Sequence, residues 1–330
     1  MIVHFRTQVT FLRCITVILA GLTFTACDSD NEIPIQTVND ESVIDEKQLK
    51  QAQQDNKKNV NGQQTLYFGF DLRASPQEDA AQYLPFLKYL QQATGLNYKL
   101  HFTGKSSSTV EDLGNNLTQL AAMGASSFLE AQNKFNAISL ARGLNHQNKA
   151  EYQSVFVVKP RSKIRRIEQI KGKRLAFGSM DSTQGHLIPR IMLTEKNIQL
   201  KDLRTYAYTG SHQNCAESVV SGKYDVCGMQ DQLAKRLAAQ GLVKIIHTSE
   251  YYPSSGIVAN PNLPENILKK IQTALLEFKP QDKHKKGLYN WDSTEMPLGF
   301  TPASANDYDN LRKWSIRLGF LKLEEPQVNK

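Results

Sequence analysis

The strongest constraint on the fold is the alternation of strand-like and helix-like segments from about residue 65 onward. Apolar runs with β-like composition, such as residues 66–70 and 154–159, alternate with stretches such as 80–94 that have the apolar spacing of an amphipathic helix. This order is typical of α/β folds in which helices connect parallel strands. Because about 265 residues are more than one hydrophobic core usually serves, we expect two lobes. Further strands are predicted over 97–102, 120–123, 136–141, 174–177, 206–208, 224–228 and 244–247, and further helices over 110–116, 127–135, 214–221, 231–239, 264–278 and 308–318.

A small, hydroxyl-rich turn within residues 177–190 is the most informative motif for function. A predicted strand leads into this turn and an apolar run suited to a helix follows it, so Ser182, Thr183 and Gly185 stand at a helix start. The first backbone N–H groups of a helix, with their partial positive charge, bind anions well. The same residues also fit an ordinary N-cap, in which Asp181 or Ser182 satisfies its own helix.

The first 26 residues are predicted to be a lipoprotein signal peptide. Arg6 and Arg13 precede an apolar stretch over 14–24 that is too short to span a bilayer as a permanent helix, and small residues then lead to Cys27. The layout resembles the bacterial lipoprotein signal, in which this cysteine becomes the lipidated first mature residue. Asp28 resembles the signal that keeps lipoproteins on the inner membrane, so we expect a location on the periplasmic side of the cell envelope. A plain signal peptide or an uncleaved anchor stays the alternative.

Residues 27–64 are predicted to form a flexible tether. The segment after Cys27 has no aromatic residue and few aliphatic ones, so it cannot bury enough apolar area to offset its chain entropy. The formal net charge is +8, and because the tether carries eight acids and four lysines, most of the positive charge lies in the body. A basic body suits an anionic ligand or an anionic membrane, and export to the envelope argues against nucleic acid.

Two cysteines, Cys215 and Cys227, remain in the body. The helix and the returning strand predicted around them would bring both sulfur atoms to the same end, so a disulfide and a pair of buried free thiols are both compatible with the sequence. Neither a metal-ligand spacing nor a CxxC redox motif is present, and we expect no metal and no cofactor.

A series of short motifs follows in a fixed order through the body. They include Pro85-Phe-Leu-Lys-Tyr-Leu, Met123-Gly-Ala-Ser-Ser, Tyr152-Gln-Ser-Val, Asp181-Ser-Thr-Gln-Gly-His, Gly210-Ser-His and Gly299-Phe-Thr-Pro-Ala. In this order, over about residues 67–321, the chain resembles the phosphate, phosphite and phosphonate binding proteins of ABC importers. The resemblance implies a two-lobed α/β fold of the type II periplasmic-binding-protein kind, with two mixed sheets flanked by helices and a hinge between the lobes. It places lobe one at 65–152 plus 252–330 and lobe two at 153–251.

The resemblance also implies a set of ligand-binding residues. Tyr152, Ser182, Thr183 and His212 stand where the family grips a phosphorus oxyanion with an aromatic hydroxyl, a helix-start turn and a histidine. Hydroxyl and N–H groups are suitable donors to oxyanion oxygens. Within the turn, Gln184 replaces the family's third hydroxyl and is followed by Gly185.

The wall contributed by lobe one is less defined by sequence. Ser126 and Ser127 follow a predicted strand and could donate to the ligand, or could be small only to admit the facing lobe. Ser106 stands where aminoethylphosphonate binders have a tyrosine. Where those proteins place two acids around the ligand's ammonium group, Gln232 (or Asp231) and Ser255 align, which argues against an aminoethyl ligand because a buried ammonium would lack a partner.

These observations predict a lipid-anchored, monomeric solute-binding protein that is not an enzyme. It would capture phosphate, phosphite, an alkylphosphonate or a phosphate ester between its lobes and deliver it to an ABC permease in the inner membrane. A protein of the same fold could instead report its ligand to a membrane signalling partner. An envelope hydrolase is the weakest alternative, since the sequence has neither a GxSxG turn nor an HExxH motif.

Overall fold

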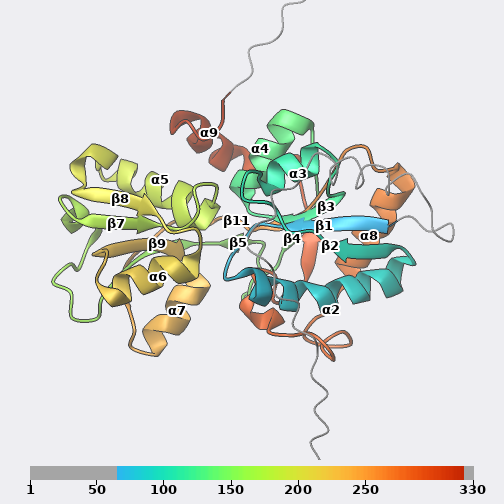
Figure 1. Cartoon of the computed structure of the whole chain (residues 1–330), viewed down its shortest axis with the longest axis horizontal. Coiled ribbons are helices and arrows are strands. Elements are labelled where there is room, and N and C mark those ends of the chain that lie inside the picture. Colours follow the sequence, from blue (N-terminus) through green and yellow to red (C-terminus); the bar gives the residue numbers. More distant parts are fainter. Residues whose placement is uncertain (1–64, 323–330) are drawn as a thin grey trace, which may run out of the picture. The chain divides into compact units, whose positions relative to one another are not determined.

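The computed structural model describes residues 65–322, apart from the side chain of Ala305 (Figure 1). The predicted signal peptide, the tether and Cys27 lie outside the described residues. Within the described range, no helix combines the length and the apolar character needed to cross a membrane.

A six-stranded mixed sheet forms the centre of lobe one. Its strand order is β13-β4-β12-β3-β1-β2; β1 runs parallel to β2 and β3, whereas β12 runs antiparallel to β3 and β4, and β13 antiparallel to β4. The strands are β1 (Thr65–Phe70), β2 (Asn97–Leu100), β3 (Leu120–Met123), β4 (Ile138–Gly143), β12 (Gly256–Ala259) and β13 (Phe300–Pro302). The helices are α2 (Pro76–Thr94), α3 (Thr109–Gly114), α4 (Ala125–Phe135), α8 (Glu265–Glu277) and α9 (Asp309–Arg317).

A five-stranded mixed sheet forms the centre of lobe two, in the order β10-β6-β9-β7-β8. The strands are β6 (Ser154–Val158), β7 (Arg174–Phe177), β8 (Thr205–Tyr208), β9 (Val226–Gln230) and β10 (Lys244–Thr248), and the helices are α5 (Ile188–Glu195), α6 (His212–Ser221) and α7 (Asp231–Ala239). β7 is parallel to β8 and β9, and β6 is antiparallel to β9 and β10. The carboxyl ends of β7, β8, β9 and β10 therefore lie at one end of this sheet, together with the start of β6. We call this the site end and the opposite one the distal end.

A short two-stranded ribbon joins the two sheets. β5 (Glu151–Tyr152) carries the chain from the first sheet to the second, and β11 (Tyr252–Pro253), which pairs antiparallel with β5, carries it back. Figure 1 shows this ribbon between the two sheets. The fold is therefore the two-lobed α/β architecture with two mixed sheets and a hinge. The short helical turns are η1 (Ile167–Ile170), η2 (Thr183–Leu187), η3 (Leu200–Asp202), η4 (Trp291–Ser293) and η5 (Ala305–Tyr308).

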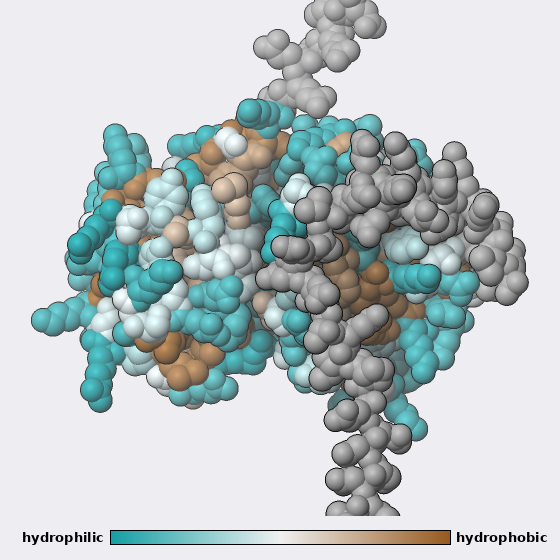
Figure 2. Space-filling model, in the orientation of Figure 1, coloured by the Kyte–Doolittle hydropathy of each residue, from teal (hydrophilic) through white to brown (hydrophobic). Residues whose placement is uncertain are grey.

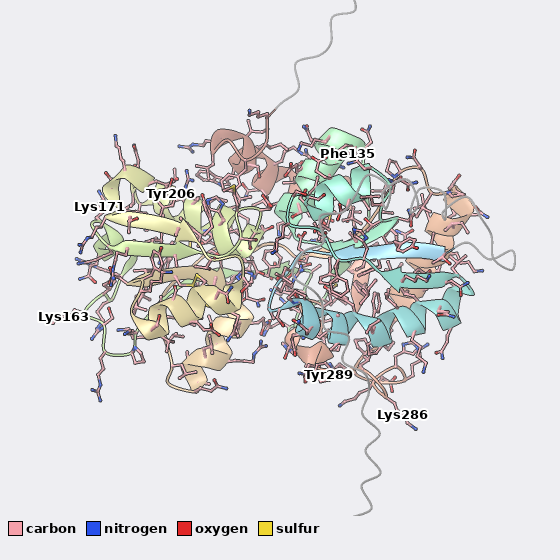
Figure 3. All side chains as sticks on the ribbon, viewed as in Figure 1. Phe135, Lys163, Lys171, Tyr206, Lys286 and Tyr289 are labelled. Carbon is pink, nitrogen blue, oxygen red and sulfur yellow. A yellow bond between two sulfur atoms is a disulfide. The ribbon has the colours of Figure 1, made fainter. Side chains whose placement is uncertain are left out.

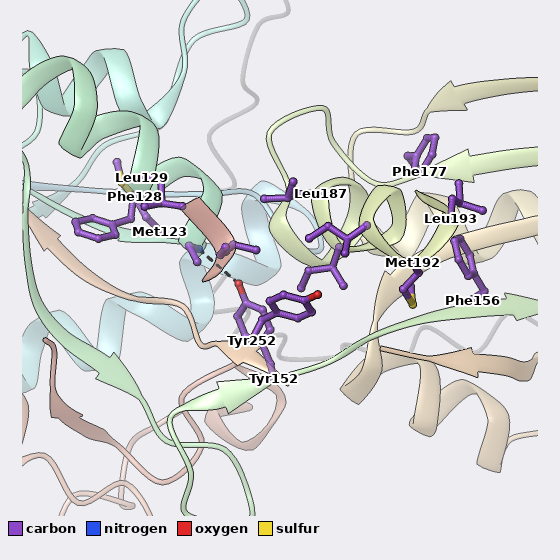
Figure 4. Close-up of a cluster of buried hydrophobic side chains, with 14 of the residues drawn as sticks. Met123, Phe128, Leu129, Tyr152, Phe156, Phe177, Leu187, Met192, Leu193 and Tyr252 are labelled. Carbon is purple, nitrogen blue, oxygen red and sulfur yellow. Dashed lines mark hydrogen bonds between the residues drawn. The ribbon is translucent and has the colours of Figure 1, made fainter. Parts of the chain in front are cut away.

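The hydrophobic core lies on both faces of each sheet. In lobe one an aromatic group that includes Phe86, Phe278 and Trp291 packs ring against ring, with centroid separations of 5.1–5.2 Å. Another cluster extends from Phe128 of α4 in lobe one through Tyr152 and Tyr252 of the ribbon to Phe156 and Phe177 of lobe two (Figure 4). Burial of large side chains on this scale is the main favourable term for folding.

Cys215 and Cys227 form a disulfide, with the Cα atoms 5.7 Å apart. The bond ties the first turn of α6 to β9, and both residues are fully buried. Of the two alternatives that the sequence left open, the structure has the disulfide.

Candidate ligand-binding site

The turn between β7 and α5 closes on itself at the site end of lobe two. The Ser182 hydroxyl accepts a 2.8 Å hydrogen bond from the N–H of Gly185, and the Ser182 carbonyl accepts from His186 and Leu187. Residues Thr183–Leu187 form a single π-helical turn before α5. Ser182 thus caps its own helix, as the N-cap interpretation of the sequence requires.

Close packing behind this turn explains its glycine. The N–H of Gly178 donates to the carbonyl of Gly185 at 2.9 Å. A Cβ added to Gly185 would lie 3.0 Å from Cε1 of His212 and 2.8 Å from the Ser182 hydroxyl. Only glycine fits between these groups without displacing one of them.

His212 is buried beneath the turn and is uncharged. Burial lowers its pKa to about 4, so the ring is neutral near pH 7. Its Nδ1 accepts a long hydrogen bond, 3.4 Å, from the N–H of Gln230. The neutral ring therefore carries its proton on Nε2, which leaves one donor for a partner.

The start of α4 faces the turn from lobe one. The N–H of Ser126 donates to the Thr183 hydroxyl at 2.8 Å, and the N–H of Ala125 lies 3.5 Å from the Tyr152 hydroxyl (dashed line in Figure 4). Burial raises the pKa of Tyr152, and the neighbouring Thr183 hydroxyl partly offsets this effect. The N-cap residue Gly124 provides no side-chain cap, so these hydroxyl groups satisfy part of the helix terminus.

Asp71 occupies a further donor at this terminus. Its carboxylate accepts from the N–H of Gly124 at 2.8 Å, and the buried Ser127 hydroxyl lies near it. Burial raises the pKa of Asp71, an effect only partly offset by the nearby Arg73 guanidinium. The N–H groups at the start of α4 therefore already donate to oxygen atoms of the protein itself. These oxygen atoms belong to one carboxylate and two hydroxyl groups.

A buried ion pair next to this terminus could not be recognised from sequence. Arg73 lies 2.9 Å from Glu295, and its guanidinium also donates to the carbonyl of Asp71 at 2.8 Å. The Ser255 hydroxyl donates to the same Glu295 carboxylate. Although burial alone would raise the pKa of Glu295, Arg73 and Ser255 hold it below its ordinary value, so this acid is ionised.

A cavity of about 150 Å³ adjoins these residues and is lined from both lobes and the β5 strand. Its walls include Tyr152, Gln184 and three acids, Glu151, Asp231 and Glu295, against one cation, Lys235. The Lys235 ammonium lies 2.6 Å from one Asp231 oxygen, while the other is buried and has no hydrogen-bond partner among the described residues. The Gln184 amide donates to the carbonyl of Gln153 at 2.8 Å. Each of the three acids has a cationic partner, because Glu295 pairs with Arg73 and Glu151 with Lys149 at 3.3 Å.

Comparison with known proteins identifies the family. A family model described as "ABC transporter, phosphonate, periplasmic substrate-binding protein" matches residues 68–308. This chain belongs to that family. Its members are periplasmic substrate-binding proteins of ABC phosphonate importers rather than enzymes.

Individual relatives agree with this family assignment. The chain is 27% identical over 233 residues to the "Phosphonates-binding periplasmic protein" of Escherichia coli (strain K12), covering 67% of this chain and 69% of that protein. It is 25% identical over 192 residues to the "Probable ABC transporter phosphite binding protein PhnD1" of Prochlorococcus marinus (strain MIT 9301), covering 52% of this chain and 63% of that protein.

Solved structures share the fold. The structure of PhnD1 from Prochlorococcus marinus in complex with methylphosphonate superimposes with a TM-score of 0.71 at 20% identity, covering 78% of this chain and 99% of that chain. A binding protein component of an ABC phosphonate transporter from Pseudomonas aeruginosa gives a TM-score of 0.68, also at 20% identity, covering 77% and 86%. At this identity the likeness concerns the fold alone.

The predicted site residues of this family member fall into distinct positions. Tyr152, Thr183, Ser126 and Ser127 meet at the start of α4, whereas Gln184 lines the cavity. Of the other predictions on lobe two, Ser182 and Gly185 belong to the packed turn itself, and His212 at the start of α6 packs against it.

Ser106 is exposed in the turn between β2 and α3, and its role in binding stays a prediction. His186, which the sequence left between ligand contact and structure, uses both ring nitrogens within the protein, at 2.7 Å from the carbonyl of Met180 and 3.1 Å from the Tyr208 hydroxyl.

The structure changes one argument about the ligand. The family resemblance placed Ser255 where aminoethylphosphonate binders have an acid, and the Ser255 hydroxyl donates to the buried carboxylate of Glu295. Asp231 stands on the other side as a second cavity-lining acid. Acids therefore line the cavity, although Arg73 and Lys235 already pair with them. Glu295 was missed because only the fold brings it to residues 73 and 255.

Proposed function

We propose that this chain captures a phosphorus oxyanion between its two lobes and delivers it to an ABC permease. The observation that carries the proposal is the convergence of the Ser126 N–H with the hydroxyl groups of Thr183 and Tyr152. Each of these three groups can donate a hydrogen bond to an oxyanion oxygen. Ser126 belongs to lobe one, Thr183 to lobe two and Tyr152 to the ribbon between them. The N-terminus of α4 adds a favourable dipole for an anion at this point.

Binding would replace contacts within the protein by contacts with the ligand. The oxyanion would take the place of the hydroxyl oxygens as acceptor for the Ser126 N–H, and the hydroxyl groups would turn to donate to it. Lobe closure removes the anion from water, which strengthens every such hydrogen bond. The neutral His212 donates without the cost of burying a cation.

We call the meeting point of the Ser126 N–H with the Thr183 and Tyr152 hydroxyl groups the oxyanion junction. This junction and the cavity beside it together indicate the class of ligand. Phosphate, phosphite, alkylphosphonates and phosphate esters all carry the required oxyanion. Asp231 and Glu295 have cationic partners, but the unpartnered Asp231 oxygen could still accept a hydrogen bond from a ligand whose other end is an amine or another donor. An aminoalkylphosphonate therefore joins the candidates, which include the phosphite and methylphosphonate named for the relatives.

We further propose that the mature protein is a monomer held on the inner membrane by lipid on Cys27. The sequence around Cys27 and Asp28 supports this anchor, and the segment up to residue 64 has the composition of a flexible tether. The anchor would keep the binding protein near its permease.

Calorimetric titration of the unacylated chain starting at Asp28 tests the proposal. Phosphate, phosphite, methylphosphonate and aminoethylphosphonate are titrated separately, with sulfate as a control for non-specific anion binding. We expect at least one phosphorus ligand to bind far more tightly than sulfate. Equal, weak binding of all five anions would contradict the proposal.

A further inference from the structure

The distal end of lobe two gathers an unusual number of basic side chains. The loops that meet there are residues 159–174, 195–205, 222–225 and 240–244, because the starts of β7, β8, β9 and β10 and the end of β6 lie at this end of the sheet. They contain thirteen basic residues and four acidic ones. The basic residues are Lys159, Arg161, Lys163, Arg165, Arg166, Lys171, Lys173, Arg174, Lys196, Lys201, Arg204, Lys223 and Lys244.

These four loops form one continuous surface. The N–H of Gly172 donates to the carbonyl of Asp202, and the N–H of Arg204 donates to the carbonyl of Lys173. The Lys159 ammonium lies against Gly222. The Lys244 ammonium lies 3.5 Å from the carbonyl of Ser162. We call this surface the basic end.

Little of this charge is neutralised within the described part of the chain. Eleven of the thirteen basic residues are exposed, the exceptions being Arg174 and Lys244. Arg174 pairs with Asp225 at 2.7 Å and Arg166 with Glu168 at 3.9 Å, and no other ion pair within residues 65–322 involves the thirteen. Figure 3 shows Lys163 and Lys171 projecting from the end of lobe two that points away from lobe one. In Figure 2 the same end carries projecting hydrophilic side chains.

We propose that the basic end docks on the anionic lipid surface of the membrane. The charge comes from four loops spread over one end of the lobe, which suits a broad anionic surface better than a small anion. Each lysine or arginine near such a surface strengthens binding by about fivefold. The oxyanion junction lies at the site end, opposite the basic end on the same sheet, so docking on the membrane would leave the junction uncovered.

The test measures binding to lipid vesicles with the unacylated chain that starts at Asp28. Vesicles of phosphatidylcholine alone are compared with vesicles that also contain phosphatidylglycerol, by co-sedimentation at low ionic strength. We expect binding only to the anionic vesicles, with loss of binding at about 1 M salt, where charges are screened within about 3 Å.

Two triple variants distinguish the effect of the basic end on vesicle binding from the effect of the overall net charge. The first variant combines Lys163→Gln, Lys171→Gln and Lys201→Gln at the basic end. The control combines Lys283→Gln, Lys285→Gln and Lys286→Gln, which are exposed on lobe one and change the net charge equally. Because these are exposed substitutions, the thermal midpoint of both variants should match that of the unaltered protein.

We expect the first variant to lose vesicle affinity on the order of 100-fold and the control to lose little. An equal loss in both variants, or equal binding to neutral and anionic vesicles, would overturn the proposal. So would binding to soluble polyglutamate without binding to anionic vesicles, since that outcome would indicate an acidic protein partner.

Discussion

The backbone N–H of Ser126 and the hydroxyl of Thr183, 57 residues apart in the chain, lie 2.8 Å apart and join the two lobes. A single hydrogen bond of this kind contributes only about 1 kcal/mol. The bond matters for function because it positions the start of α4 in lobe one beside the hydroxyl-rich turn of lobe two.

Replacement of Thr183 by valine should weaken oxyanion binding by about 1–3 kcal/mol, because the variant keeps the shape of the side chain but removes its hydroxyl. Calorimetric titration with the tightest phosphorus ligand measures the change. Thr205→Val, at the exposed start of β8 on the distal end, is the matched control and should bind normally. Normal affinity in both Thr183→Val and Tyr152→Phe would place the ligand elsewhere.

Asp231→Asn should reduce affinity for aminoethylphosphonate more than for methylphosphonate. The carboxylate has one buried oxygen without a partner among the described residues, and removing its charge takes away about 1–3 kcal/mol of interaction with an ammonium group. The ratio of the two dissociation constants is the readout. Glu265→Gln, at the exposed start of α8, should leave this ratio unchanged. An unchanged ratio in Asp231→Asn would exclude a contact between Asp231 and the amine.

Breaking the Arg73–Glu295 pair should strongly destabilise the protein. Arg73→Met leaves a buried carboxylate without its cation, at a cost of about 3–5 kcal/mol in the free energy of unfolding. The double variant Arg73→Met with Glu295→Met should be less destabilised than the sum of the single variants, because no charge is left unpaired. Urea unfolding of all four proteins gives this comparison, and strictly additive losses would argue against coupling.

Stability should fall as the pH drops from 6.5 towards 4. Burial lowers the pKa of both His212 and His186 from 6.5 to about 4, so in this window the unfolded chain binds more protons than the folded one. The stabilisation is complete above pH 6.5, and the loss approaches roughly 3 kcal/mol for each histidine at low pH.

Urea unfolding at several pH values measures this slope. His212→Gln should flatten it relative to the unaltered protein, and the carboxylates common to both proteins, such as Asp71, cancel in the difference. An identical slope in the variant would show that His212 is not buried as a neutral ring.

Removal of the disulfide should lower the free energy of unfolding by about 2–4 kcal/mol. The double variant Cys215→Ala with Cys227→Ala should show this loss in urea, and a reducing agent should produce a similar loss in the unaltered protein only. Insensitivity of the unaltered protein to reductant would indicate free thiols.

Much of the fold could be predicted because it depends on local patterns. The strands predicted over 66–70 and 154–159 are apolar runs, and the helix predicted over 80–94 has an amphipathic spacing. In the structure this helix begins four residues earlier, at Pro76, after the Ser75 cap. β12 (Gly256–Ala259) was missed, although it lies inside the sheet between β3 and β4. Its four residues follow two serines and precede Asn-Pro, so only pairing with distant strands makes it a strand.

The candidate site was predictable only where one short motif held the chemistry. Ser182 and Thr183 stand together in the sequence, and their helix start followed from the adjoining strand and apolar run. Arg73 and Glu295 are 222 residues apart, and no periodicity or spacing connects them. The same holds for the pairing of Ser255 with Glu295, which changed the argument about the ligand.

Tyr152 belongs to the narrow ribbon by which the chain passes from one sheet to the other, and its hydroxyl reaches the start of α4. Any bending of this ribbon therefore moves the Tyr152 side chain as well. Opening of the lobes would therefore move a ligand-binding hydroxyl at the same time. A substitution that makes the ribbon more flexible should then lower the affinity for the ligand.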